Sequence, residues 1–350
     1  MCVPDRFRTI GLAWSPPSGD EVWFTATDTG FSRSLRAVSL TGRVRALLSA
    51  PGTLTLHDVG TGGRALITRD AMRAGAIGLA PGESKERDLS WQDWTVPSDI
   101  SRDGSTLLFV EAGEAGGGEY AVFTRDTKGS SAVRLGQGTA RSLSPDGQWA
   151  LVLRQNMSPP DFVLLPTGVG EQHILSTPNV TPSRGQFLLD SKHIAFDGHE
   201  AGHASRIYVM TVNGGPPRAV SPEGFSIRGV RAVSPDGKRI AAVSGKGLSL
   251  VSVDGSGEPQ AVPGTEPGDV PIGWSGDARA LLVGHQGEMG CPVSRVDLQN
   301  GTRTAWKTFS PSTIAGLVSA NCPGISADEQ HYVFGYTWIL SDLFMVENLK

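Results

Sequence analysis

Short apolar runs, separated by turn-forming residues, recur along the whole chain. In one stretch the strand-like run in FLLDSKHIAFDG (187–198) is followed by RIYVMTV (206–212), NGGPP (213–217) and RAV (218–220). Apolar runs of this length, bounded by Gly, Pro, Asn and Asp, are typical of β-strands joined by hairpins. Apolar residues do not recur at i, i+3, i+4 and i+7 over a window long enough for a packed helix. The pattern therefore predicts an all-β fold and excludes a parallel α/β fold.

A turn of the form Ser-Pro-Asp-Gly, followed by an apolar run, repeats through the sequence. It is clearest in SPDGQWALVL from Ser144 and SPDGKRIAAV from Ser234. The residues aligned with the turn Asp lie 41 to 51 positions apart: Gly62, Asp103, Asp146, Asp190, Asp236, Asp277 and Asp328. This period is the length of one four-stranded blade of a β-propeller. We expect the turn Asp side chains to cap backbone amides two residues further on, a folding role rather than a catalytic one.

The repeat predicts one β-propeller domain over residues 1–350, built of four-stranded antiparallel blades. Eight blades are expected, and the alternative is seven with an irregular remainder. The repeat units cover about 11–50, 51–92, 93–137, 138–178, 179–222, 223–265, 266–311 and 312–350. The last unit lacks a fourth strand, so the ring needs a strand from elsewhere to close. Residues 1–10, with the run from Arg6 to Ile10, are either this closing strand or the truncated end of a longer array.

Composition and charge narrow the class of protein. The chain of 350 residues is 39% hydrophobic, which is enough to bury a large core. Its 31 Lys and Arg against 35 Asp and Glu give a net charge of −4, which argues against a nucleic-acid or anionic-membrane binder. No apolar stretch approaches the roughly 18 residues of a membrane span. We expect a cytoplasmic location if the chain is complete.

Several segments resemble a known family. The stretch IAFDGHEAGHASRIYVMTVNGGPPRAVS (194–221) resembles the repeat of the periplasmic propeller TolB and its relatives. More of the chain, about residues 11–350, resembles the C-terminal TolB-like propeller region of large bacterial serine/threonine protein kinases of the eukaryotic-like type. The segments that carry this resemblance are GLAWSPPSGDEVWFTA, PGTLTLHDV, PGESKERDLSWQDWTVPSDISRDGSTLLFVEAG, EYAVFTRDT and the ending WILSDLFMVENLK.

The resemblance implies a non-catalytic binding or sensory module that recognises a protein or a small ligand. In that family a kinase domain lies N-terminal to the propeller, and an extracytoplasmic location is then the alternative. The chain itself has no Gly-rich loop with its Lys, no His-Arg-Asp loop and no Asp-Phe-Gly. We therefore expect no enzyme activity, cofactor or metal on this chain alone.

Three enzyme classes are the alternatives. His199 and His203 in HEAGH match a zinc-binding helix, but the motif lies between two predicted strands, so we expect a loop. The segment GWSGD (273–277) lacks the last glycine of a hydrolase nucleophile elbow, although an accessory domain of a prolyl-oligopeptidase-like hydrolase stays an alternative. A metal-dependent lactonase or lyase needs carboxylates and His on innermost strands, where ARSL (140–143) and GVRA (229–232) offer Arg and Ser.

Two tryptophans and eight basic residues are expected to gather on one face of the propeller. Loops from second to third strands, and from each blade to the next, emerge together there. The candidate ligand face comprises Trp91, Trp94, Arg69, Arg73, Arg141, Arg154, His199, His203, Arg228 and His285. For the tryptophans two roles stay open: packing between blades, or a stacking platform for a sugar or a peptide.

Cys291 and Cys322 are expected on the same side of neighbouring blades. Two interpretations stay open for this pair. Either they are unlinked, partly buried thiols, or they form a disulfide in an oxidising compartment only. A bond requires Cα atoms within roughly 4.4 to 6.8 Å of each other.

Overall fold

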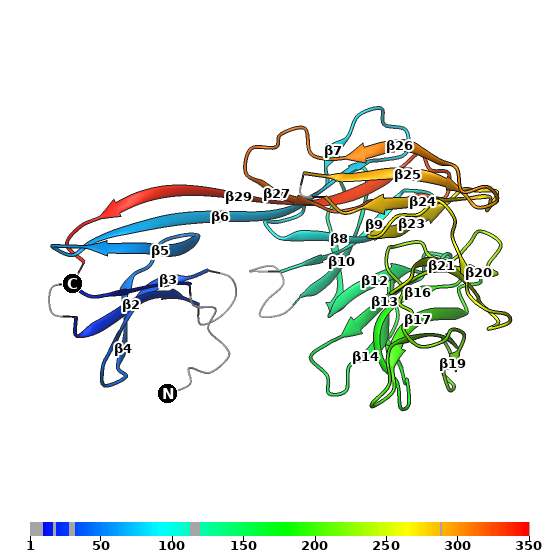
Figure 1. Ribbon diagram of the computed structural model, residues 1–350, viewed down its shortest axis with the longest axis horizontal. Helices are drawn as coiled ribbons and strands as arrows, with labels where there is room; N and C mark the ends of the chain where they lie inside the picture. The colour runs from blue at the N-terminus through cyan, green and yellow to red at the C-terminus, as the bar shows by residue number, and fades with distance from the viewer. Residues whose placement is uncertain (1–9, 17–18, 28–31, 113–119, 288, 350) are drawn as a thin grey trace. The chain divides into compact units, whose positions relative to one another are not determined.

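The computed structural model describes residues 10–16, 19–27, 32–112, 120–287 and 289–349. Within these ranges the secondary-structure elements are all β-strands, and neighbouring strands pair in an antiparallel manner (Figure 1). The all-β prediction and the four-stranded antiparallel sheets are confirmed. Since the described residues form no helix, none is long and apolar enough to cross a membrane.

The chain folds into two compact units, whereas the sequence predicts one domain over 1–350. Unit 1 comprises Met1–Arg73 and Thr337–Lys350, and unit 2 comprises Ala74–Tyr336. Both boundaries fall inside long strands, β6 (Arg64–Leu79) and β29 (Tyr332–Val346). A blade-length repeat does not predict strands of 16 and 15 residues, and the single domain over 1–350 stays a prediction.

Four sheets of unit 2 each contain four strands that follow one another in the chain. They are β8 (Thr95–Ile100), β9 (Thr106–Glu111), β10 (Ala121–Asp126) and β11 (Val133–Gln137); β12 (Thr139–Leu143), β13 (Trp149–Arg154), β14 (Asp161–Pro166) and β15 (His173–Leu175); β16 (Thr181–Phe187), β17 (His193–His199), β18 (Arg206–Thr211) and β19 (Arg218–Ala219); and β23 (Asp269–Trp274), β24 (Ala280–His285), β25 (Cys291–Asp297) and β26 (Arg303–Phe309). Each is one propeller blade.

A fifth sheet of unit 2 has three strands and an irregular inner edge. Its strands are β20 (Arg239–Ser244), β21 (Gly247–Ser252) and β22 (Gln260–Ala261). On the inner side, isolated bridges join Ser226 to Val243 and Val233 to Ile240. Residues 226–233 therefore take the place of the missing innermost strand.

The sixth sheet of unit 2 joins the two ends of that unit. Here β28 (Gly324–Ile325) and the start of β29 are completed by the end of β6 and by β7 (Arg87–Asp88) (Figure 1). Strands from residues 74–88 thus complete the sheet that joins the two ends of unit 2, and the closing-strand role of residues 1–10 stays a prediction. Of that segment, Met1–Thr9 lie outside the described residues, and Ile10 begins β1 and pairs with Thr25 of β2.

Unit 1 holds one complete four-stranded sheet and parts of another. The complete sheet contains β1 (Ile10–Trp14), β2 (Glu21–Ala26), β3 (Ser34–Ser39) and β4 (Val44–Leu48). The other parts are β5 (Thr53–Gly60) with the beginning of β6 and the end of β29. The strand β27 (Leu317–Ala320), a neighbour of β29 in its sheet, belongs to unit 2. Trp23, Leu35, Leu56 and Ile67 are buried between these sheets.

The recurring turn has the structure that its sequence predicts. At Asp146 the carboxylate accepts a hydrogen bond from the Gln148 amide at 3.1 Å, while the Ser144 hydroxyl accepts one from the Trp149 amide at 2.9 Å. The same bond to the amide two residues on is made by Asp103, Asp190, Asp236, Asp277 and Asp328. The predicted capping of backbone amides by these aspartates is confirmed.

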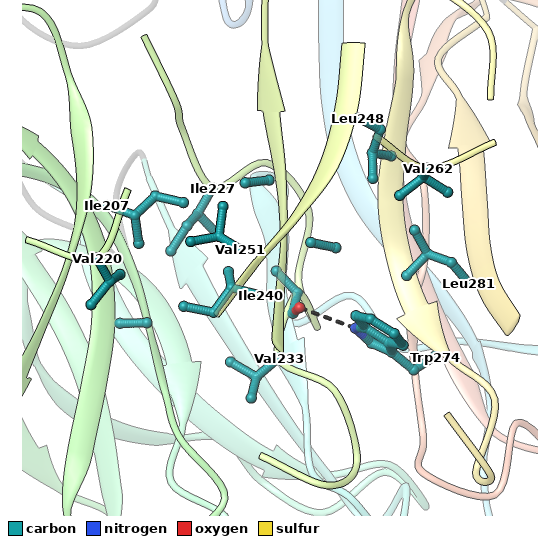
Figure 2. Packing of buried hydrophobic residues seen from close by; sticks show 14 of the residues in the cluster. Ile207, Val220, Ile227, Val233, Ile240, Leu248, Val251, Val262, Trp274 and Leu281 are labelled. Carbon is teal, nitrogen blue, oxygen red and sulfur yellow. Dashed lines mark hydrogen bonds between the residues drawn. The ribbon is translucent and has the colours of Figure 1, made fainter. Parts of the chain in front are cut away.

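Neighbouring blades pack through apolar side chains. In the cluster shown in Figure 2, Ile207 and Val220 come from one sheet, Val251 from the next, and Trp274 from a third. The Trp274 indole Nε1 donates a hydrogen bond to the Ala232 carbonyl at 3.0 Å. The Arg239 guanidinium lies over the same indole, 5.0 Å from the ring centroid. The Ala232 carbonyl and the Arg239 guanidinium, both from the neighbouring blade, thus hold the Trp274 indole in position.

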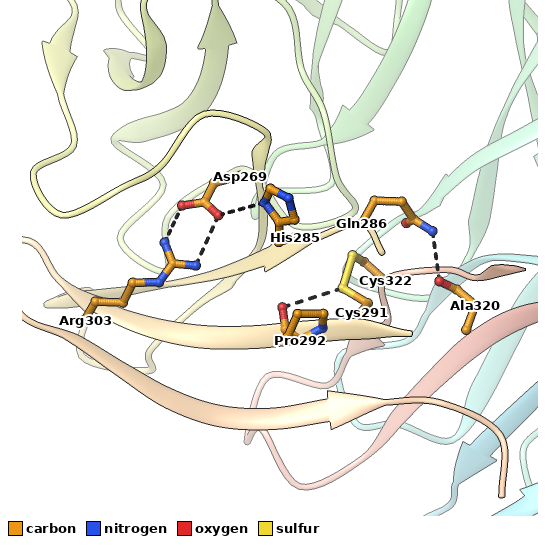
Figure 3. Close-up of a disulfide and its surroundings, with 8 residues drawn as sticks. All are labelled: Asp269, His285, Gln286, Cys291, Pro292, Arg303, Ala320 and Cys322. Carbon is orange, nitrogen blue, oxygen red and sulfur yellow. Dashed lines mark hydrogen bonds and ion pairs between the residues drawn. A yellow bond between two sulfur atoms is a disulfide. The ribbon is translucent and has the colours of Figure 1, made fainter. Parts of the chain in front are cut away.

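Cys291 and Cys322 form a disulfide, with their Cα atoms 5.0 Å apart (Figure 3). The bond links β25 to the segment just before β28, so it joins two neighbouring blades. Beside it, Gln286 Nε2 donates to the Ala320 carbonyl at 2.8 Å. The sequence left open whether the two cysteines are unlinked thiols or form a disulfide, and in the structure they form the disulfide.

Removing the disulfide is expected to destabilise the protein by about 3 kcal/mol, because the bond closes a loop of 31 residues in the unfolded chain. We expect this loss for Cys291→Ala/Cys322→Ala in urea unfolding of protein made in an oxidising host. Dithiothreitol should reproduce it in the wild type and change nothing further in the double variant. Equal stability of the wild type with and without reductant would contradict a stabilising bridge.

We expect the close packing of the sheet that joins the two ends of unit 2 to require glycine at position 78. A Cβ there would lie 2.7 Å from Leu89 Cδ1 and 2.7 Å from the Tyr332 carbonyl oxygen, in the sheet that joins the ends of unit 2. Such overpacking costs about 1 to 3 kcal/mol. We therefore expect Gly78→Ala to lower the urea midpoint, compared with Gly168→Ala, where nothing lies within 4 Å. An equal effect of the two substitutions would contradict this packing.

Candidate functional site

One position is equivalent in all six sheets of unit 2: the second residue before the recurring turn. The first strands of these sheets contact one another around the unit, β8 with β12, β12 with β16, β23 with β28, and β28 with β8. Strand pairing and the backbone bonds of residues 226–233 align the equivalent residues as Asp99, Ser142, Gln186, Ala232, Gly273 and Gly324. We call these six residues the inner ring.

Three inner-ring side chains bind the backbone of the next sheet. Asp99 Oδ2 accepts a hydrogen bond from the Leu143 amide at 2.9 Å, and Ser142 Oγ accepts one from the Phe187 amide at 3.2 Å. Gln186 Oε1 accepts one from the Ala232 amide at 3.1 Å. Four successive sheets are tied together in this way.

The other half of the inner ring has small residues and leaves a cavity of about 240 Å³. A Cβ at Gly273 would meet only Leu282 Cδ1, at 4.0 Å. The cavity, which we call the channel cavity, is lined by Arg102, Arg231, Val233, Pro235, Gly273, Trp274, Gly276, Leu282, Ile325, Ser326, Ala327 and Glu329. These residues come from four sheets, so the cavity lies where the innermost strands meet.

Two guanidinium groups line the channel cavity. Arg231 Nη2 donates to the Ile100 carbonyl at 2.6 Å, while its Nε is buried without a hydrogen-bond partner. The Arg102 side chain has no hydrogen bond or ion pair with the described part of the chain. Burial, followed by the nearby charge of Arg102, lowers the pKa of Arg231, and Asp99 opposes this. Glu329, the acidic residue of this lining, is already paired with Arg295.

A smaller cavity of about 70 Å³ shares Arg102, Arg231 and Val233 with the first. Its lining includes Asp99 and Gln186 from the inner ring. The Gln186 side chain is 6% exposed, and its amide Nε2 has no partner. The two cavities together thus contain hydrogen-bond donors whose acceptors are missing.

Asp99 is the buried acid beside these donors. Its Oδ1 and Oδ2 accept from the amides of Ile100 and Leu143 at 2.8 and 2.9 Å. Burial raises the pKa of Asp99 to about 6, although the Arg231 charge and the two amides act in the opposite direction. Each carboxylate oxygen therefore accepts one backbone hydrogen bond, and neither is hydrogen-bonded to the free donors Arg231 Nε and Gln186 Nε2.

The residues predicted from the sequence do not line these two cavities. Arg69 and Arg73 belong to unit 1, where Arg69 pairs with Asp342 at 2.7 Å and lies over the Phe344 ring. The other eight belong to unit 2. His199 pairs with Thr181 at the beginning of β16, while the channel cavity lies near the ends of the innermost strands.

Three of the six predicted basic residues in unit 2 have acidic partners. Arg154 Nε donates to Asp161 Oδ1 at 2.7 Å. His203 Nδ1 lies 2.9 Å from Glu223 Oε1, and His285 Nδ1 lies 3.7 Å from Asp269 Oδ1 (Figure 3). HEAGH forms the end of β17 and the loop after it, as predicted, and His199 and Arg228 are exposed. In the described residues no group of three or more His, Cys, Asp or Glu could hold a metal ion.

The remaining predicted residues lie in packed surroundings. The Arg125 guanidinium lies 5.5 Å from the Trp91 ring centroid, and the Trp94 amide donates to Glu111 at 2.9 Å. Arg141 is half-buried; burial, with Arg184 nearby, lowers its pKa to about 10.

The residues that do form the cavities were missed, although aligning the repeats could have found them. The second residue before each turn is polar in three of the six sheets of unit 2 and small in the other three. Arg102 occupies the turn position that holds Pro145, Leu189, Pro235, Gly276 and Ala327 in the other units. A lone Arg in a column of non-ionisable residues was the available signal.

Asp99 is expected to make stability fall as pH rises from about 4 to about 6. The folded protein keeps a proton on Asp99 until about pH 6, whereas the unfolded chain loses it near the ordinary pKa of 3.8. Linkage then costs roughly 3 kcal/mol across that interval. Asp99→Asn should lack this loss, so the free energy of unfolding in urea of the variant should rise relative to wild type between pH 4 and 7. A pH-independent difference would contradict the burial of this acid.

No family model and no curated protein matches the chain. Among solved structures, the putative TolB from Agrobacterium tumefaciens is 17% identical, with 77% of this chain and 99% of that chain covered and a TM-score of 0.56. TolB from Acinetobacter baumannii is 16% identical, with 67% and 64% covered and a TM-score of 0.51. A puromycin-hydrolyzing peptidase from Mycobacterium tuberculosis is 15% identical, with 91% and 56% covered and a TM-score of 0.47. At these identities the likeness concerns the fold alone, and the fold of this chain is that of a TolB-like β-propeller.

Proposed function

We propose that this protein is a non-catalytic binding or sensory module whose propeller unit takes a small ligand in the channel cavity. The observation that carries the proposal is the Arg231 guanidinium in the lining of this cavity, whose buried Nε has no partner, beside the exposed Arg102 side chain. The buried Gln186 amide Nε2, also without a partner, lies in the adjoining smaller cavity. Buried polar groups in proteins are nearly always hydrogen-bonded, so the unpaired Arg231 Nε and Gln186 Nε2 beside two adjoining cavities support a missing acceptor.

The chemistry of the lining favours binding over catalysis. Covalent catalysis needs a nucleophile within hydrogen-bond reach of a base. Among the described lining residues, Ser326 is bound to the turn carboxylate of Asp328, and Glu329 is paired with Arg295. Neither group is free to act on a bound molecule.

Attachment to a bacterial serine/threonine kinase is the finer part of the proposal and rests on the sequence resemblance. A propeller of this kind would place a ligand-binding domain in the same polypeptide as the kinase and so connect a ligand to signalling. The genomic DNA upstream of Met1 tests it. An in-frame kinase domain supports the attachment, and an in-frame stop codon close upstream contradicts it.

Filling the channel cavity is expected to abolish ligand binding without unfolding the protein. Gly273 is not in the left-handed region, and a side chain there would enter open space. In a thermal-shift screen of a metabolite library, we expect hits that raise the melting temperature of the wild type by several degrees. The same compounds should not shift Gly273→Val, but should still shift the matched control Gly168→Val.

Hits that stabilise Gly273→Val as strongly as the wild type would place ligand binding elsewhere and contradict the proposed site. Circular dichroism of Gly273→Val establishes whether it keeps the β-sheet fold. If it does not, Gly273→Ala, which adds a single methyl group to the cavity, replaces it in the same comparison.

A further inference from the structure

We infer that the channel cavity binds a small organic carboxylate, with the carboxylate between Arg102 and Arg231 and the apolar part against Trp274, Leu282 and Ile325. The inference rests on the proposed binding function and specifies its ligand class. It follows from the charges, the free donors and the walls of the cavity.

The charges around the cavity leave an unbalanced positive site. Arg102 and Arg231 are the cations of the lining. Glu329 is paired with Arg295, and the charge of the buried Asp99 acts on Arg231 and offsets part of the positive charge. Asp328 lies close enough to act on Arg231, but its carboxylate is held in its own turn by the Ser326 hydroxyl and the Gln330 amide. An added anion could pair with the exposed Arg102 guanidinium and with the free Nε of Arg231.

The free groups are donors, and their geometry suits a carboxylate. A guanidinium presents a planar fork of N–H groups that matches two carboxylate oxygens. Arg231 uses Nη2 on the Ile100 carbonyl and keeps a buried Nε without an acceptor. The Gln186 amide Nε2 adds a neutral donor in the adjoining cavity. A ligand carboxylate would satisfy donors that the protein leaves unpaired.

The walls indicate an organic ligand rather than an inorganic ion. Trp274, Leu282 and Ile325 are 6%, 1% and 1% exposed and line the channel cavity. The Trp274 indole already donates its N–H to the Ala232 carbonyl, so the part of the ring left for a ligand is apolar. A cavity of about 240 Å³ with one cationic and one apolar side accommodates a molecule the size of benzoate.

The test compares each acid with its neutral amide. Isothermal titration would measure acetate, butyrate, 4-methylpentanoate and benzoate, each beside the corresponding amide, at constant ionic strength. We expect at least one of the larger acids to bind at least tenfold more tightly than its amide. Arg102→Gln should weaken that acid about tenfold or more, because one charge-assisted interaction is lost, and should leave the amide unchanged.

Arg279→Gln is the matched control. Arg279 also lies in a turn of unit 2, but its side chain is 86% exposed and it does not line either cavity. Its removal lowers the net charge equally, so an effect of Arg102→Gln that Arg279→Gln does not share is a local effect. Equal weakening by both variants would overturn the assignment of Arg102.

The outcomes separate the ligand class from the proposed function. If acids and amides bind equally and Gly273→Val abolishes both, the binding site stands and the carboxylate inference fails. The carboxylate inference also fails, and the binding site also stands, if no acid binds at about 10 mM but the metabolite screen finds neutral ligands that do not stabilise Gly273→Val. If no compound of either experiment depends on Gly273, both proposals fail.

The carboxylate can belong to a free acid or to the C-terminus of a peptide. A second set of titrations distinguishes these two sources. Tripeptides ending in Leu or Phe are titrated with a free and with an amidated C-terminus. We expect the free small acids to bind at least as tightly as these peptides, because the cavity is small. Tighter binding of the free-terminus peptides alone would show a peptide ligand and overturn the small-acid assignment.

Discussion

The propeller unit depends on hydrogen bonds from side chains of one innermost strand to the backbone of the next. Asp99, Ser142 and Gln186 make these bonds at equivalent positions and join four sheets. Such bonds fix the distance between adjacent blades, since the donor and acceptor of a hydrogen bond must stay within a narrow range of distances. The rest of the ring is joined differently, by the Trp274 indole, by the disulfide of Cys291 and Cys322, and by the sheet that combines β28 and β29 with β6 and β7.

On one side of the inner ring the side chains bind the next strand, and on the other side the residues are small. This difference explains why the channel cavity lies on one side of the channel. Where the inner ring carries Asp99, Ser142 or Gln186, the side chain is bound to the next strand and only the smaller cavity of about 70 Å³ remains. Where it carries Ala232, Gly273 and Gly324, no side chain reaches the centre, and the channel cavity remains beside Gly273. Arg231 reaches across to Ile100 and brings its charge into the space that the glycines leave. Burying a cation so incompletely paired is costly for stability, which favours a role in binding.

Much of the fold could be predicted from the sequence, because the turn signal is local. Each turn Asp binds an amide two residues away, so Ser-Pro-Asp-Gly identifies a hairpin without any knowledge of tertiary structure. The division of β6 and β29 between two units could not be predicted in this way. Whether a strand stops after six residues or continues for 16 depends on which neighbours pair with it, and the repeat contains no such information.

The candidate site was harder to predict, because β-bulges decide which side chains face the channel. Register shifts directly precede Asp99, Ser142 and Gly273, and each exchanges the two faces of the strand at that point. A simple alternation of apolar and polar residues therefore fails at these positions. Loop residues such as His199 and Arg154 were easier to select, yet Arg154 pairs with Asp161 and His199 lies at the other end of its sheet.

The central claim is that the unpaired donors of the inner strands form a ligand site. Anomalous diffraction from crystals soaked in 4-iodobenzoate tests it most directly, since iodine can be located without reference to the protein model. The account predicts an iodine peak beside Trp274, Leu282 and Ile325, with the carboxylate density between Arg102 and Arg231. Iodine peaks confined to other surfaces, or a carboxylate directed away from both guanidinium groups, would contradict it.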